Sequence, residues 1–122
     1  MIHLGLGATA VPQPPFTGMD WYADYTDRVA SDGDEGRLVA MFEFDAGAWD
    51  HWEMHPGGSE VVLCITGQLT LIQEIGGEEV RTVLAAGDYA INDPGVWHTA
   101  EVAESARGIF ITSGRGTEHR AI

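Results

Sequence analysis

Short runs of alternating apolar and polar residues, separated by turn-forming residues, make up most of the chain from residue 37 onward. The runs are rich in β-branched and aromatic residues and end at sequences such as DAG, PGG, IGGEE and DPG, which is typical of short β-strands joined by turns. No stretch has a convincing helical period, so we expect an all-β sandwich or barrel. The predicted strands are residues 38–44, 51–55, 60–66, 68–75, 79–84, 88–92, 97–102 and 108–112.

The first 37 residues have a different pattern. Residues 1–20 are rich in Pro and Gly and predict an extended arm, whereas residues 21–29 are aromatic and acidic and fit either a strand or a single helical turn. We therefore expect two parts: residues 1–37 as an N-terminal arm that packs on the barrel or on a partner subunit, and residues 38–122 as the barrel with a short C-terminal tail.

Strand parity gathers metal-binding side chains on one face, because successive side chains of a strand point to opposite faces. The residues that share this face around the run 51–55 are Trp49, His51, Glu53 and His55. The next run follows a tight PGGS turn and places Glu60 and Cys64 on one face. A hairpin between the two runs would bring Glu60 opposite His55. If His98, at the end of the run PGVWH, also points inward, one barrel interior collects two imidazoles and two carboxylates.

The opposite parity is apolar and needs a cover, since a sheet that exposed so many large side chains would be prone to association. Its members are Trp52, Met54, Val61, Leu63, Ile65 and Trp97. Two covers are available: the aromatic N-terminal segment, which contains Phe16, Trp21, Tyr22 and Tyr25, and a second copy of the chain. We expect both to act together, which predicts a homodimer.

Composition and charge narrow the classes of partner. The 122 residues are 44% hydrophobic, which suits one domain with its own core. The formal charge of −13, from 19 acidic and 6 basic residues, repels nucleic acid and anionic membranes. The single cysteine excludes an intrachain disulfide, and no run is long enough to cross a membrane. The N-terminus lacks the basic segment of a signal peptide, so we expect a cytoplasmic protein whose partner is a small molecule.

The spacing of these residues resembles the two motifs of the cupin family, over about residues 38–112. The first motif is matched by Gly47, Glu53, His55, Glu60 and Gly67, with Glu53 where the family has its first histidine; the second is matched by Gly87, Gly95 and His98. Pro94 stands one place late and Val102 occupies the usual position of an asparagine. The resemblance implies a double-stranded β-helix (jelly-roll) barrel, close to the small single-domain cupins that carry WEMHP.

The resemblance also implies a metal site in which His55, Glu60 and His98 are ligands. Imidazole and carboxylate donors suit a divalent transition metal such as Fe, Mn, Ni or Zn, and burying them without a cation would be costly. Glu53 is either a fourth ligand or a catalytic general base, whose pKa we expect a dry barrel to raise. His51 is the other candidate for the missing ligand, or it lines the mouth of the pocket.

Three further residues are candidates near the predicted site. Trp49 is a candidate pocket residue, and Cys64 is either a buried, inert core thiol or a lumen residue beside the site. His119 is a tail residue that either folds over the barrel mouth or stays in solvent.

These features predict a metal-dependent enzyme that acts on a small organic substrate with two oxygen donors. Iron would favour dioxygenase chemistry, whereas nickel, manganese or zinc would favour isomerase or lyase chemistry with Glu53 moving the proton. The alternative is a non-catalytic cupin module that binds a metal or a small ligand. A third reading, a metal-free sugar isomerase, requires a tyrosine acid in the lumen, for which Tyr89 is the candidate.

Overall fold

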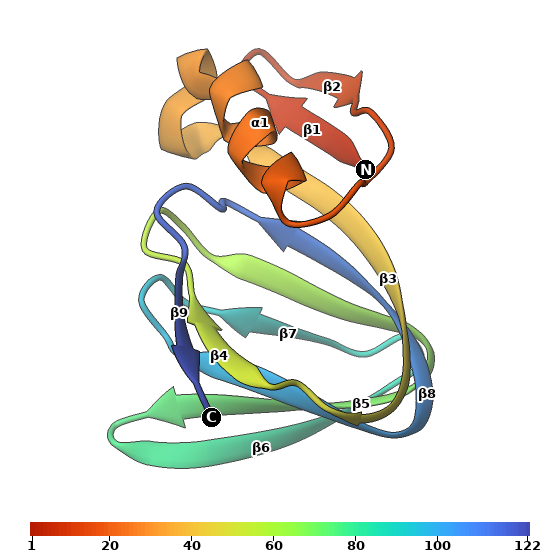
Figure 1. The fold of residues 1–122 in the computed structure, drawn as a ribbon. Coiled ribbons are helices and arrows are strands. Elements are labelled where there is room, and N and C mark those ends of the chain that lie inside the picture. The colour runs from red at the N-terminus through yellow and green to blue at the C-terminus, as the bar shows by residue number, and fades with distance from the viewer.

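A computed structural model describes all residues, 1–122, and confirms the all-β prediction (Figure 1). The helical elements are α1 (Asp20–Arg28) and the 3-10 segment η1 (Ala30–Glu35). The strands are β1 (Ile2–Gly5), β2 (Thr9–Pro12), β3 (Arg37–Ala48), β4 (His51–Met54), β5 (Glu60–Ile75), β6 (Glu78–Ala85), β7 (Tyr89–Asn92), β8 (His98–Thr112) and β9 (Glu118–Ala121). Neither helical element is long and apolar enough to cross a membrane.

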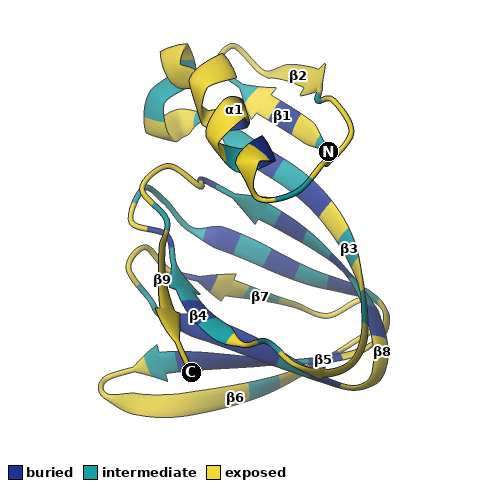
Figure 2. Cartoon of the chain, in the orientation of Figure 1, coloured by how far each residue is buried: buried dark blue, intermediate teal, exposed yellow.

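The strands curl into a barrel around one apolar core. Along one path the order is β2-β1-β3-β8-β4-β9, and β5 joins it by pairing with β8 while also pairing with β6 and β7. The interior cluster is Val62, Cys64, Leu69, Leu84, Ala100, Val102, Ala106 and Phe110. Figure 2 shows the result as buried segments along β5 and β8, whereas β6 is almost entirely exposed.

Two of the predicted turns are bends within long strands. The predicted runs 60–66 and 68–75 form the single strand β5, and the runs 97–102 and 108–112 join in the single strand β8, which begins one residue later than predicted, at His98. At the bend in β5, Gly67 has φ +72, and a Cβ there would lie 2.0 Å from the carbonyl oxygen of Ser105. Only glycine tolerates both the positive φ and the close approach of Ser105. Gly67, which the sequence suggested was part of a turn, instead lets β5 pass close to β8.

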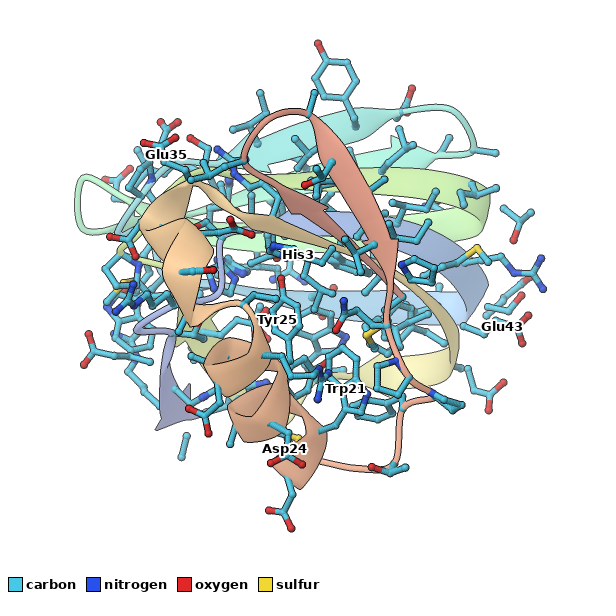
Figure 3. All side chains as sticks on the ribbon, turned by 90° about the horizontal axis from the view of Figure 1, so that it is seen from above. His3, Trp21, Asp24, Tyr25, Glu35 and Glu43 are labelled. Atoms are coloured by element: carbon cyan, nitrogen blue, oxygen red, sulfur yellow. The ribbon has the colours of Figure 1, made fainter.

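The N-terminal region is more ordered than the extended arm that its composition predicts. β1 and β2 form a hairpin, and β1 extends the sheet by pairing with β3. Residues 20–28 form the helix α1, in which Trp21 and Tyr25 stack one turn apart with ring centroids 5.4 Å apart. His3 donates or accepts hydrogen bonds of 2.6 Å at both ring nitrogens, to Tyr25 and to Asp32. Figure 3 shows His3, Tyr25 and Trp21 together between α1 and the hairpin.

The aromatic segment covers a different face from the one predicted. Trp21 packs on Leu38, and Phe16 meets Phe42 edge to face at 6.3 Å. Phe42 packs on the interior core, so this segment closes the inward side of β3 and does not lie on the outer apolar face. The N-terminal segment is therefore not the cover that strand parity requires for that face.

The C-terminus forms a strand in place of the expected tail. β9 pairs with β4, opposite Trp52 and Glu53. Its Arg120 lies over two indoles, 5.2 Å from the ring of Trp52 and 4.7 Å from that of Trp97. Both tryptophans thus point away from the interior, as parity predicts, and the guanidinium covers them through cation–π contacts.

Candidate metal centre

Three strands bring the predicted donor residues together. Glu53 lies on β4, His55 just after it, Glu60 at the start of β5 and His98 at the start of β8. One donor atom from each of the four lies within 4.8 Å of the others. The predicted hairpin between the runs 51–55 and 60–66 is wrong, because Glu60 pairs with Asn92 of β7 while Glu53 pairs with His98. The cluster forms through barrel closure.

The separations between donor atoms are those of ligands around one ion. His55 Nε2 lies 3.2 Å from Glu60 Oε2, and His98 Nε2 lies 3.2 Å from Glu60 Oε1. Glu53 Oε1 lies 3.6 Å and 3.4 Å from the same two nitrogens. Metal–ligand bonds of about 2.1 Å give neighbouring ligands separations of about 3.0 Å in octahedral and 3.4 Å in tetrahedral geometry. The four residues therefore fit a divalent transition metal.

The environment of His98 fixes the tautomer that its neutral ring adopts. Nδ1 lies 3.0 Å from the carbonyl oxygen of Val96, which can only accept, so Nδ1–H donates to it. In the neutral ring the lone pair then lies on Nε2. This atom is buried, has no hydrogen-bond partner and faces the two carboxylates. A lone pair held against anionic oxygens needs a cation between them or a proton on Nε2.

The same logic holds for His55. Its Nδ1 lies 2.8 Å from Thr117 Oγ1, and that hydroxyl donates its own proton to the carbonyl oxygen of Gly114 at 2.7 Å. The hydroxyl must therefore accept from Nδ1–H, which again leaves the lone pair on a buried Nε2 without a hydrogen-bond partner. Both imidazoles are presented in the tautomer that ligates through Nε2, with the other nitrogen oriented by a neighbouring group.

Glu60 is oriented by residues that the sequence motifs did not reveal. Oε1 accepts from Asn92 Nδ2 at 3.0 Å, and Oε2 accepts from the hydroxyl of Thr112 at 2.6 Å. Asn92 is itself held by Gln73 Nε2 at 2.7 Å. This buried network fixes the carboxylate while leaving further lone pairs free for a ligand bond. Strand parity could have placed these residues in the interior, but it could not have paired them with Glu60.

The four groups shift one another's pKa values. Burial alone would lower the pKa of His55 and His98, but their contacts with Glu53 and Glu60 outweigh it and raise both pKa values to about 9. Burial would raise the pKa of Glu60, yet the two imidazoles lower it to about 2. We therefore expect the metal-free cluster to hold two imidazolium and two carboxylate groups near neutral pH.

The same contacts correct one expectation for Glu53. Burial acts to raise its pKa, but His55 and His98 outweigh burial, and the pKa falls well below its ordinary value. The raised pKa expected for a general base is therefore absent when the two histidines are charged. No hydroxyl, amide or guanidinium donates a hydrogen bond to the Glu53 carboxylate, which distinguishes it from Glu60.

The remaining candidates separate by position. Cys64 is buried in the interior core, where its thiol donates to the carbonyl oxygens of Thr66 and Gly67, and burial raises its pKa. Trp49 is half-buried, packs against the same core and stacks on His51 with ring centroids 6.0 Å apart. His51 lies outside the four-residue cluster, with Nε2 3.8 Å from Glu53 Oε2.

Two tyrosines, Tyr89 and Tyr22, lie in positions that the sequence analysis did not predict. Tyr89 is 65% exposed on β7, so the tyrosine acid sought for a metal-free isomerase is not in the lumen. Tyr22 of α1 is half-buried, and its pKa is raised by burial and further by the negative charge of Glu53. Its aromatic character alone suggested packing, and only the helix places its hydroxyl within the field of the cluster.

Comparison with known proteins supports the fold. A family model of the cupin domain matches residues 40–114, and no curated protein sequence matches the chain. An oxalate oxidase structure is 19% identical with a TM-score of 0.57, over 66% of this chain and 44% of that one. A cupin-2 domain protein from Shewanella frigidimarina NCIMB 400 is 20% identical with a TM-score of 0.54, over 62% and 69%.

The cupin domain of Drosophila melanogaster CENP-C is also similar, at 17% identity and a TM-score of 0.54 over 60% of this chain and 58% of that one. The chain thus spans less than two thirds of the CENP-C and oxalate oxidase chains, and at these identities the likeness concerns the fold alone. The cupin-domain match covers more than half of the sequence. The chain belongs to the cupin family, and its all-β jelly-roll barrel is the fold that its two motifs predict.

Proposed function

We propose that this cupin is a metal-dependent enzyme that acts on a small organic molecule, with His55, Glu60, His98 and Glu53 around a divalent ion such as Fe, Mn, Ni or Zn. One observation carries the proposal: two buried imidazole Nε2 atoms without hydrogen-bond partners face the buried carboxylate of Glu60 and the partly buried carboxylate of Glu53. When neutral, each imidazole is held in the tautomer that ligates through Nε2. The distances between donor atoms match those between ligands of a single ion.

The chain's own residues suggest how a substrate would be handled. When bound, the ion would supply Lewis-acid chemistry, or redox chemistry if it is iron. Two imidazoles and one carboxylate fill three positions and leave others open, which suits a substrate with two oxygen donors. Glu53 has two alternative roles here: it completes the set as a fourth ligand, or it stays off the ion and acts as a base beside it. Tyr22 lies within reach of its field and is protonated at neutral pH.

Metal content is the first test. Protein purified without chelators should retain a transition metal, and Glu60→Gln should lose it, because the amide keeps the shape but not the charge. Glu43→Gln is a matched control: Glu43 is an exposed carboxylate on β3 that pairs with Arg107, and its substitution should leave metal content unchanged. Equal metal in all three proteins, or none in any of them after reconstitution, would contradict the proposal.

A non-catalytic binding module is the alternative from the same site. The neighbours in fold include both an oxalate oxidase and a domain of CENP-C, so the barrel itself does not separate the two readings. Oxygen uptake, or a change in substrate absorbance, would be screened with diketones, hydroxyacids and catechols on the metal-loaded protein. Turnover that Glu60→Gln abolishes supports the enzyme, whereas binding without turnover supports the module.

We also propose a homodimer formed through the outer apolar face. Five strands bring apolar side chains into one register row there: Ile2, Val39, Ile111, Val61 and Ile91. The neighbouring row contains Met41, Ile109, Leu63 and Tyr89. Met41 and Tyr89 are 58% and 65% exposed, which leaves a continuous apolar surface. Light scattering should show a dimer for the native chain and a monomer for Met41→Glu.

A further inference from the structure

A second set of metal-binding side chains lies beside the first, nearer the solvent. His51, Glu53 and His119 each offer a donor atom, and these atoms lie within 4.8 Å of one another. The side chains of His51 and His119 are 39% and 47% exposed, whereas that of Glu53 is 18% exposed. The set therefore reaches from the barrel interior to its surface, and Glu53 is the member that both clusters share.

The two oxygens of Glu53 are divided between the two clusters. Oε1 faces inward, 3.6 Å from His55 Nε2 and 3.4 Å from His98 Nε2. Oε2 faces outward, 3.8 Å from His51 Nε2 and 3.5 Å from His119 Nε2. All the ion-pair contacts of the Glu53 carboxylate are therefore with imidazole nitrogens, which are atoms able to ligate a metal. A carboxylate in this position can bridge two cations, one on each oxygen.

His51 is held in the orientation that a ligand needs. Its Nδ1 lies 2.7 Å from the carboxylate of Asp50, which accepts the proton and leaves the lone pair on Nε2, facing Glu53. A carboxylate behind a histidine is a common arrangement around metals, where it fixes the tautomer and raises the basicity of the ring. The indole of Trp49 stacks on the imidazole at an interplanar angle of 20° and supports its plane.

His119 is positioned by the C-terminal strand. β9 lies beside β4 (Figure 1), and in their antiparallel pairing His119 stands opposite Glu53. Its ring meets that of His51 edge to face, with centroids 5.2 Å apart. Arg120, the next residue, anchors the strand by lying between Trp52 and Trp97. The position of His119 thus follows from sheet pairing and from a neighbouring contact, which a freely moving tail would not provide.

We propose that Glu53 bridges two divalent transition-metal ions, the inner one in the centre described above and a second, outer one held by His51, Glu53 and His119. Only the inner ion rests on the proposed function; the outer triad has its own donors. Two imidazoles and one carboxylate leave the outer ion several open positions toward solvent. In a chain with a net charge of −13, a cation at the mouth would also attract small anionic substrates that the protein surface otherwise repels.

Metal stoichiometry tests the outer site. Metal-free full-length protein is equilibrated with Zn²⁺ by dialysis, and bound metal is measured by mass spectrometry. We expect about two equivalents for the native chain and about one for His119→Ala, with Glu118→Ala, an exposed neighbour on β9, as the matched control that keeps both. A second readout uses Mn²⁺: its spin-coupled resonance signal, expected for a bridged pair, should vanish in His119→Ala.

The measured stoichiometries distinguish failure of the outer site from failure of the inner one. About one equivalent in both the native chain and His119→Ala overturns the outer site and leaves the inner centre intact. No bound metal in any variant overturns both sites. Two equivalents that survive in His119→Ala also overturn the proposal, because the second ion would then lie elsewhere. Circular dichroism of each variant separates a lost ligand from a lost fold.

Discussion

Metal binding should release protons from the inner cluster, and this release can be worked out from the structure. The pKa values of His55 and His98 are raised to about 9, so at neutral pH both rings carry a proton on Nε2, the atom that must ligate. An incoming divalent ion has to displace both protons. At pH 7, competition from each proton weakens metal binding by about a hundredfold. The apparent affinity for the ion is therefore about ten-thousandfold weaker at pH 7 than at high pH, where both rings are neutral.

Calorimetry measures this coupling directly. Zn²⁺ is titrated at pH 7 into metal-free protein in two buffers that differ in protonation enthalpy, and the difference in observed heat gives the number of protons released. We expect about two protons for the inner ion, and an affinity that rises by about two log units per pH unit between pH 6 and 7.5. His119→Ala is the suitable background, because it removes the outer triad and leaves one ion to titrate.

Binding that releases no protons and has the same affinity across this pH range would refute the reasoning. It would mean that both imidazoles are already neutral, so that Glu53 and Glu60 do not raise their pKa values as the short contacts imply. A release of about one proton would mean that the two rings share a single charge, with only one imidazolium present at pH 7.

Three further predictions follow from other contacts. In urea unfolding, the free energy of unfolding of the metal-free protein should fall as the pH rises from about 6.5 to 9. The raised pKa values of His55 and His98 stabilise the fold fully below about pH 6.5, and this contribution is lost above about pH 9. The metal-loaded protein should not show this fall. Thr112→Val removes a hydroxyl donor to Glu60 and should weaken Zn²⁺ binding by about tenfold or more in competition with a chelator. Leu69→Ala should lower the free energy of unfolding by about 2–5 kcal/mol, because the side chain is 1% exposed in the core; a loss below 1 kcal/mol would contradict the assignment of the core.

The barrel and the inner cluster could be predicted because their signals are local. Turn sequences and alternating polarity mark the strands, strand parity places Glu53 and His55 on one shared face, and the spacing of the two motifs singles out Glu60 and His98. The pairing partners could not be obtained in this way. Glu60 pairs with β7 and Glu53 with β8, and these contacts depend on closure of the barrel over long sequence separations.

The parts that the sequence did not predict depend on tertiary contacts. The helix α1 is short, and Trp21 and Tyr25 stabilise it chiefly by packing against Leu38 and His3. β9 is a stretch of four exposed residues with no apolar alternation, and it is a strand because β4 offers a free edge and Arg120 binds two indoles. Since His119 lies on β9, the outer triad could be recognised only after the fold was known.

Anomalous scattering from a crystal of the protein purified without chelators would test the central claim most directly. Data collected on either side of the absorption edge of the bound element identify the metal and locate it in one experiment. We predict a peak at bonding distance from His55 Nε2, His98 Nε2 and the Glu60 carboxylate. No peak there after reconstitution, with both imidazole Nε2 atoms instead bonded to the carboxylates or to water, would contradict the metal centre.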